Sequence, residues 1–286
     1  MGSELMTKER LLELIPNRYK FMYRNLVSWK NSMNLERRNL PDFIIIGVQK
    51  GGTSTLFSLL ERHPQIKGSV FKEVHYYDYN FSKGIKWYRS FFPIKSSLTR
   101  LVGEASPYYF FHPLVPNRIK QDNPNVKLIL LLRDPVARAY SHYQMERRKH
   151  KEKIESFEEA IEVEESRIAP EIAKMDQDPF YFSSSHQTYS YVSRGYYGDQ
   201  LERWYKYFDR DQILVLKSED FFGDPSAIIK KVYDFLDVDD FQDLSFQPKN
   251  QGNYGNMKHE TVELLKEKFR KDQVKLNELL DRRIDW

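Results

Sequence analysis

The sequence contains no cysteine among its 286 residues. A disulfide framework, a thiolate metal site and a cysteine nucleophile are therefore excluded. A chain without cysteine suits a reducing compartment, and we expect a cytoplasmic location. The longest apolar runs, at 43–48 and 128–132, have the length of buried strands and fall well short of the roughly 20 residues of a membrane helix. No membrane span is predicted, and the charged N-terminal region lacks the apolar centre of a secretory signal.

A large excess of one charge is also missing. The chain has 45 Lys and Arg against 41 Asp and Glu, a formal net charge of +4. This balance favours small anionic ligands and argues against nucleic acid as a partner. Hydrophobic residues at 40% and charged residues at 30% are typical of a globular domain. The sequence does not fix the oligomeric state.

Continuous apolar runs at 43–48 and 126–132 are typical of strands covered on both faces in a parallel sheet. A third strand is predicted at 212–216, and helices at 53–62, 199–207, 225–236 and 259–280. There is no internal repeat and no flexible linker. We predict one α/β domain over 41–286, with a central parallel sheet flanked by helices, preceded by an amphipathic helical arm over 1–40.

Two further segments have a distinctive composition. Residues 146–176 begin basic and become acidic, a pattern that predicts a solvated helix. Residues 180–197 are dense in Tyr, Ser and His, which suits a loop that lines a cleft.

Residues 47–55 read Gly-Val-Gln-Lys-Gly-Gly-Thr-Ser-Thr between the first strand and its helix. Glycines let the backbone wrap around an anion, and the free amides and dipole of the helix N-terminus favour negative charge. The pattern lacks the lysine that follows the last glycine in nucleotide triphosphatases, and its one lysine, Lys50, lies inside the loop. This predicts a P-loop-like phosphate-binding loop whose ligand is shorter than a nucleoside triphosphate. The alternative is a tight turn without a ligand.

Three stretches resemble the sulfotransferases that use 3'-phosphoadenosine 5'-phosphosulfate (PAPS), most closely the heparan sulfate sulfotransferases and their bacterial relatives. Residues 47–53 resemble the loop that holds the 5'-phosphosulfate. Residues 72–78, Lys-Glu-Val-His-Tyr-Tyr-Asp, resemble the segment that carries the catalytic base. Residues 132–141, Leu-Arg-Asp-Pro-Val-Ala-Arg-Ala-Tyr-Ser, resemble the motif that holds the 3'-phosphate. The resemblance extends over about residues 41–286.

The resemblance implies an enzyme of the EC 2.8.2 class. It would move a sulfuryl group from PAPS by in-line displacement to a hydroxyl or amine of a small-molecule or oligosaccharide acceptor, with carbohydrate sulfation expected. The implied catalytic residues are Lys50, at the leaving phosphate oxygen, Glu73, as general base, and His75, which assists Glu73 or binds substrate. The implied PAPS-binding residues are Lys50, Gly51, Gly52, Thr53, Ser54, Arg133, Ser141 and Phe246.

Simpler interpretations stay open for these residues. Arg133 could form a salt bridge with Asp134 at the strand end, Glu73 could be a surface carboxylate, and His75 could be a hydrogen-bonded core histidine. Histidines such as His63 and His142 lack the spacing of metal ligands, so no metal is predicted.

The chain departs from the heparan sulfate pattern at two places. Ala105 stands where those enzymes carry a lysine, and residues 249–258 replace their disulfide and lysine-rich loop. In this second region Lys249 or Lys258 would supply charge, and Phe246 would stack on the adenine. The competing functions are a nucleotide-dependent kinase, which the missing loop lysine disfavours, and a non-catalytic saccharide-binding module, which would not need both ends of a nucleotide site.

Overall fold

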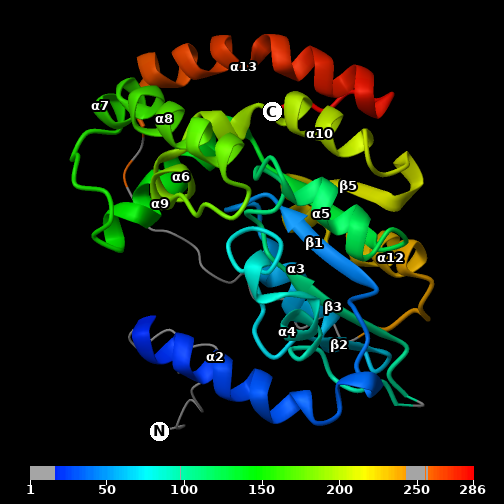
Figure 1. The fold of residues 1–286 in the computed structure, drawn as a ribbon. Coiled ribbons are helices and arrows are strands. Elements are labelled where there is room, and N and C mark those ends of the chain that lie inside the picture. The colour runs from blue at the N-terminus through cyan, green and yellow to red at the C-terminus, as the bar shows by residue number, and fades with distance from the viewer. Residues whose placement is uncertain (1–16, 97, 243–254, 256) are drawn as a thin grey trace, which may run out of the picture.

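The computed structural model describes residues 17–96, 98–242, 255 and 257–286. Five parallel strands form one sheet in the order β2-β3-β1-β4-β5 (Figure 1). Their bounds are β1 Phe43–Gly47, β2 Ile66–Gly68, β3 Leu101–Ala105, β4 Lys127–Leu132 and β5 Ile213–Lys217.

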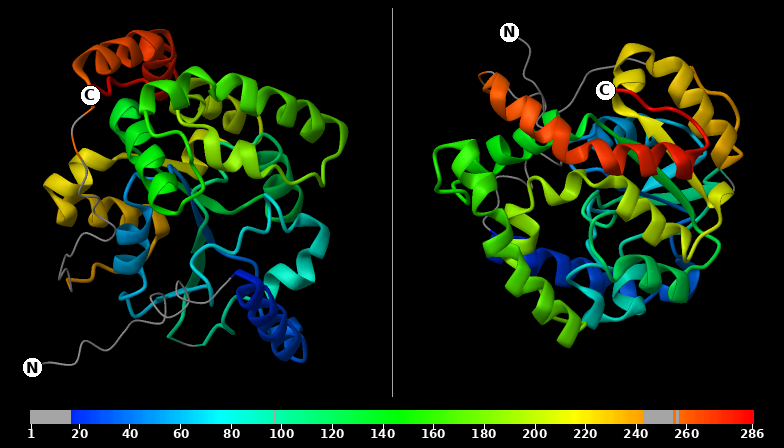
Figure 2. Two further views of the ribbon diagram at one scale, coloured as in Figure 1. Left: turned by 90° about the vertical axis from the view of Figure 1, so that its left-hand side faces the viewer. Right: turned by 90° about the horizontal axis from the view of Figure 1, so that it is seen from above.

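Helices cover both faces of the sheet, and α13 runs across its upper end (Figures 1 and 2). The helices are α2 Asn17–Ser32, α3 Thr53–Leu60, α4 Ile85–Arg89, α5 Val115–Asp122, α6 Pro135–Arg148, α7 Phe157–Glu162, α8 Glu164–Gln177, α9 Ser184–Tyr189, α10 Tyr197–Tyr205, α11 Ser218–Gly223, α12 Pro225–Leu236 and α13 His259–Leu280. The predicted fold class, an α/β domain with a central parallel sheet flanked by helices, is confirmed. Among the helices described, none has both the length and the apolar character of a membrane-crossing segment.

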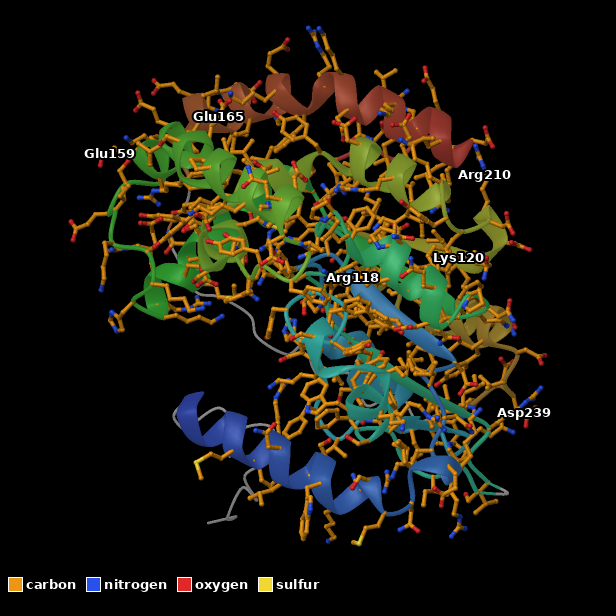
Figure 3. The ribbon with its side chains drawn as sticks, viewed as in Figure 1. Arg118, Lys120, Glu159, Glu165, Arg210 and Asp239 are labelled. Carbon is orange, nitrogen blue, oxygen red and sulfur yellow. The ribbon has the colours of Figure 1, made fainter. Side chains whose placement is uncertain are left out.

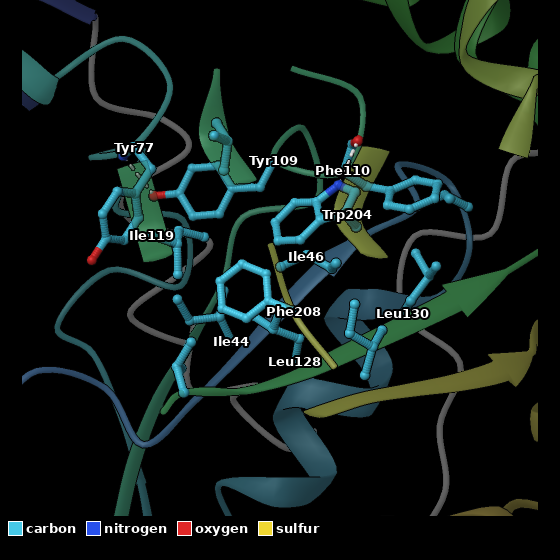
Figure 4. Close-up of a cluster of buried hydrophobic side chains, with 14 of the residues drawn as sticks. Ile44, Ile46, Tyr77, Tyr109, Phe110, Ile119, Leu128, Leu130, Trp204 and Phe208 are labelled. Carbon is cyan, nitrogen blue, oxygen red and sulfur yellow. Dashed lines mark hydrogen bonds between the residues drawn. The ribbon is translucent and has the colours of Figure 1, made fainter. Parts of the chain in front are cut away.

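Successive side chains along each strand point to opposite faces of the sheet, so the core has two layers. Ile44 and Ile46 of β1 and Leu128 and Leu130 of β4 face the layer that contains α5 and α10 (Figure 4). Their neighbours in sequence face the other layer, beneath α3 and α12. Because each strand buries both faces, the sequence needs apolar residues at every strand position, which explains the continuous runs at β1 and β4.

The strand order creates a switch point between β1 and β4. After β1 the chain goes to the outermost strand β2 and returns to β3, on one side of β1, whereas β4 and β5 lie on the other side. The loops that follow β1 and β4 therefore diverge above two adjacent strands. Such a switch point is where open α/β sheets bind ligands, at the carboxyl ends of the strands.

Strands β2 and β3 were not predicted, because neither is a continuous apolar run. In β3, Gly103 lies against the ring of Phe43, where an added Cβ would be 2.3 Å from the ring. Glu104 in the same strand is fully buried. A strand that contains glycine and a buried carboxylate has no apolar pattern to reveal it.

The prediction of one solvated helix over 146–176 is wrong. The segment contains the end of α6, a connection, and the helices α7 and α8. Glu159 and Glu165 lie at the outer surface, as expected (Figure 3). Glu152, in contrast, is buried and accepts hydrogen bonds from Arg167 at 2.6 Å and from the Tyr191 hydroxyl at 2.8 Å. Some charged side chains of this segment therefore form buried contacts that stabilise the fold, while others face solvent.

The segment 180–197 is not wholly a loop either, because it contains α9 and a short 3-10 helix at Ser193–Gly195. Its histidine, His186, is buried against the Phe111 ring and hydrogen-bonded to the Tyr108 hydroxyl at 2.6 Å. The aromatic and polar residues that suggested a cleft lining are partly a packed layer.

Within the predicted arm, α2 packs against the domain. Tyr23 meets the edge of the Phe71 ring at 5.6 Å, and the Asn31 side chain donates to the Ser90 carbonyl oxygen at 2.7 Å. Figure 1 shows α2 running beside α4, below the β2 edge of the sheet.

Candidate active site

The phosphate loop, residues 48–52, joins β1 to α3 at the carboxyl edge of the sheet. A Cβ added at Gly51 would lie 2.6 Å from the Leu131 carbonyl oxygen, so only glycine fits there. Lys50 and Gly52 adopt the left-handed region, with φ of 73° and 95°. The loop therefore curls tightly in front of the first turn of α3, where Thr53 and Ser54 lie and where backbone amides lack intrahelical partners.

Positive charge gathers around Lys50. Burial, followed by the charges of Arg148, Arg133 and Lys149, lowers the pKa of Lys50 to about 8. Arg133 lies directly against the loop, because its Nη1 donates to the Lys50 carbonyl oxygen at 2.9 Å. Glu146, whose Oε1 lies 3.5 Å from Lys149 Nζ, offsets only part of this charge, and such a cluster of cations favours an anionic ligand.

Arg133 and Ser141 lie in the part of the chain that follows β4, the strand beside β1. Arg133 follows β4 directly, and Ser141 is a buried residue of α6. Asp134 caps α6 by accepting a hydrogen bond from the Val136 amide at 2.9 Å. The Asp134 carboxylate thus serves the helix, and the structure shows Arg133 bonded to the phosphate loop instead.

The base segment, residues 72–78, follows β2 at the same edge of the sheet. Three of its side chains form a hydrogen-bonded row: Asp78 Oδ2 lies 2.6 Å from His75 Nδ1, and His75 Nε2 lies 2.9 Å from Glu73 Oε2. The side chains are 0%, 9% and 39% exposed in that order. The row therefore leads from a buried carboxylate through an imidazole to a carboxylate that reaches solvent.

The charges of this row follow from its contacts. Burial opposes the charged form of His75, but Asp78 and Glu73 outweigh it and raise the pKa of His75 to about 9. Burial likewise opposes ionisation of Glu73, but Lys72, whose Nζ lies 3.0 Å from Glu73 Oε1, and His75 together hold the pKa of Glu73 below its usual range. With its pKa raised to about 9, His75 is expected to be a cation at neutral pH and to donate both ring protons, and Glu73 is the carboxylate of the row that reaches solvent.

A buried carboxylate holds the backbone of the base segment. Glu104 accepts hydrogen bonds from the Val74 amide at 3.1 Å and from the Ser106 and Tyr88 hydroxyls at 2.8 and 2.5 Å. Ser106 Oγ in turn accepts from the His75 amide at 3.3 Å. His75 has φ of 55°, a strained value for a residue with a side chain, so the turn needs such external support.

The opposite end of the base segment is held by Arg118 of α5, which points into the centre of the molecule in Figure 3. Its Nη1 donates to the Asp78 carbonyl oxygen at 2.9 Å. Tyr76, between the two ends, is 2% exposed and stacks on Tyr88 at 4.7 Å, so it belongs to the core.

Sequence reasoning missed several supporting residues. Asp78 lies inside the segment already recognised, three residues after His75, and that spacing in a turn could have revealed it. Arg194 gave no such signal; it is buried and donates to Gln49 Oε1 of the phosphate loop at 2.6 Å. Glu104 was visible only as part of the motif that contains Ala105.

The predicted residues near the C-terminus are only partly placed. Phe246 and Lys249 lie outside the described residues. Lys258 Nζ lies 3.6 Å from Glu158 Oε2, where it serves an ion pair. In the part of the chain that the structure describes, no three His, Asp or Glu side chains gather as metal ligands would, and the absence of a metal stays a prediction.

A family model for the sulfotransferase domain matches residues 40–278. The chain belongs to the sulfotransferase family. The family inferred from the three motifs is therefore confirmed, and with it the assignment to the transferases that move sulfuryl groups. The match begins after α2, which lies outside it.

Individual relatives agree with the family. The chain is 29% identical to the membrane-associated sulfotransferase kil1 of Dictyostelium discoideum, over 86% of this chain and 66% of the relative. It is 34% identical to the mouse heparan sulfate glucosamine 3-O-sulfotransferase 3B1, over 70% of this chain and 46% of the relative. The chain thus spans less than two thirds of the length of these relatives. A crystal structure of a sulfotransferase from Alicyclobacillus acidocaldarius superposes with a TM-score of 0.70 at 28% identity, covering 86% of this chain and 98% of that chain.

Proposed function

We propose that this chain transfers a sulfuryl group from PAPS to a hydroxyl or amine of a carbohydrate, with Glu73 as the general base. The observation that carries the proposal is the row from Asp78 through His75 to Glu73, on the same sheet edge as a positively charged phosphate loop. The row suits a group that accepts a proton, and the phosphate loop suits an anionic sulfuryl donor.

The residues that follow β1 and β4 suit the donor. Gly51 lets the loop pack tightly against the Leu131 carbonyl oxygen, and the amides and hydroxyls at Thr53 and Ser54 would hold the 5'-phosphosulfate. Arg133 and Ser141 would hold the 3'-phosphate, since a forked guanidinium matches phosphate oxygens. PAPS supplies a sulfuryl group on a good leaving group, and Lys50 would face the negative charge that develops on the departing phosphate oxygen.

Glu73 would take the proton that the acceptor loses. The acceptor oxygen or nitrogen forms a bond to sulfur, the bond from sulfur to the 5'-phosphate oxygen breaks, and the acceptor proton passes to Glu73. The acceptor proton becomes more acidic as the new bond forms, so a carboxylate with a lowered pKa can still receive it. His75 would hold Glu73 in place and keep it ionised, which favours the assisting role over substrate binding.

A polar, anionic carbohydrate is the acceptor class that the surroundings support. Arg148 and Lys149 are exposed beside Lys50, and Lys72 pairs with Glu73. Tyr76 is buried in the core, so it offers no aromatic face to an acceptor. Relatives named for heparan sulfate glucosamine add support. The cytoplasmic location stays a prediction, and the relative kil1 is named membrane-associated.

The direct test is donor and acceptor use. The chain is incubated with PAPS labelled in its sulfuryl group, in the presence of a metal chelator, with a panel of saccharides and simple phenols. We expect label on saccharides, without any need for metal. Phosphoryl transfer from ATP with magnesium, and none from PAPS, would make the chain a kinase. Binding of the product nucleotide 3'-phosphoadenosine 5'-phosphate (PAP) without any transfer would make it a binding module.

A further inference from the structure

The base segment has support from outside the matched domain. Arg24 of α2 places its guanidinium over the backbone of the segment: Nη2 donates to the Glu73 carbonyl oxygen at 2.7 Å and Nη1 donates to the Val74 carbonyl oxygen at 2.9 Å. The same guanidinium stacks over the Phe71 ring, with Cζ 4.8 Å from its centroid. One side chain thus fixes two consecutive peptide groups directly before the strained turn at His75.

We infer that Arg24 is a positioning residue for the Glu73 and His75 pair, so that α2 completes the active site. The inference rests on the proposed role of Glu73. A guanidinium presents its donors in a rigid fork, and two carbonyl oxygens held by one fork cannot rotate independently. The orientation of these two peptides sets the direction in which the Glu73 side chain leaves the backbone.

The contacts on the other side of the segment show why a second support is needed. Glu104 and Ser106 hold the amides of Val74 and His75, but they do not touch the carbonyl oxygens. Arg24 binds the complementary groups of the same peptides. With both sets of contacts in place, the left-handed turn at His75 is fixed from two directions, and Glu73 Oε2 stays 2.9 Å from His75 Nε2.

The arm also carries matched controls. Lys30 is an exposed basic residue of the same helix, so Lys30→Ala removes the same charge from the same element without touching the base segment. Asn31 helps to dock α2 through the Ser90 carbonyl oxygen, so Asn31→Ala loosens the helix without removing the fork. A merely structural arm would make Arg24→Ala and Asn31→Ala behave alike.

The experiment measures the single-turnover rate with PAPS, the affinity for PAP, and the titration of the His75 ring by NMR. We expect Arg24→Ala to slow the reaction by about 10- to 100-fold, because displacement of a reacting group by about 1 Å costs that much, while PAP affinity stays within about twofold. Arg24→Lys should recover part of the rate, since an ammonium replaces the charge but not the fork.

The titration is independent of catalysis. His75 faces Glu73 and Asp78, stacks on Tyr79, and lies near the charge of Glu104. We expect Arg24→Ala to loosen the contact with Glu73 and so to move the pKa of His75 down, toward its ordinary value. Lys30→Ala should leave it unchanged.

The outcomes separate the two proposals. Wild-type rate and wild-type titration in Arg24→Ala would overturn the role of Arg24 and leave the proposed function standing. An equal effect of Asn31→Ala, or a parallel loss of PAP affinity, would also overturn it, since either result means general loosening. A wild-type chain without sulfuryl transfer would remove the proposed function, and the titration would then still decide whether Arg24 orders the pair. If Arg24→Ala does not fold, Arg24→Lys carries the same test, and wild-type behaviour of that variant would contradict the need for a fork.

Discussion

Lys50 should make PAP binding depend on pH. Its pKa is lowered to about 8 by burial and by the neighbouring charges of Arg148, Arg133 and Lys149, with Glu146 acting in the opposite direction. A lysine with a lowered pKa carries its charge below that pKa and loses it as the pH rises through about 8. If PAP binds only the charged form, its affinity holds near pH 7 and weakens above about pH 8.

The size of the effect follows from the protonated fraction. A group with a pKa of about 8 is roughly nine tenths protonated at about pH 7 and roughly one tenth protonated at about pH 9. The dissociation constant of PAP should therefore rise by about tenfold between these values, or about 1.4 kcal/mol. Calorimetric titration of the chain with PAP in matched buffers at constant ionic strength measures it.

Two variants test the cause. Lys50→Arg replaces the titrating ammonium with a group that stays charged throughout this range, so the dependence on pH should disappear. Arg148→Ala removes the like charge with the largest influence, so the loss of affinity should begin at a higher pH than in the wild type. A PAP affinity that is flat between about pH 7 and pH 9, or an undiminished pH dependence in Lys50→Arg, would refute the reasoning.

Three more outcomes are expected. Glu73→Gln should lower kcat by about 10²- to 10⁴-fold with PAP affinity nearly unchanged. The control Glu159→Gln, at an exposed position, should change neither kcat nor PAP affinity. A wild-type single-turnover rate in Glu73→Gln would mean that Glu73 is not the base. Arg133→Ala should erase most of a preference of about 10- to 100-fold for PAP over AMP, and calorimetry that finds both nucleotides equal in the wild type contradicts the 3'-phosphate role. Gly51→Ala should lower both the melting temperature and PAP affinity, because its Cβ meets the Leu131 carbonyl oxygen, while Gly223→Ala, with open space around it, should do neither.

The elements that sequence reasoning found are those in which local pattern and burial agree. β1 and the phosphate loop were predictable because a strand buried on both faces must be apolar throughout, and because the turn after it needs glycine. β3 was not predictable, because its Glu104 accepts hydrogen bonds from the Tyr88 hydroxyl and the Val74 amide, which are distant in sequence, as well as from nearby Ser106. Partners that are distant in sequence leave no trace in a single sequence.

The site shows the same difference between local patterns, which the sequence reveals, and contacts that depend on the fold. Glu73 and His75 could be named because they share one short motif, and Lys50 because the loop around it has a physical signature. The distance from Asp78 to His75 and the contact from Arg24 depend on how the turn folds and on where α2 packs. The functional interpretation of Phe246 lies outside the described residues and stays a prediction.

The two sides of the proposed site differ in how they are built, and this has a consequence for how such enzymes would diversify. Lys50 and Arg133 project from the ends of adjacent central strands, where any shift would disturb the whole sheet. The base segment, in contrast, follows the short edge strand β2 and is held by individual side chains from α2, β3 and α5. Under the proposed function, substitutions among those supports would alter the acceptor side while the donor side stays fixed.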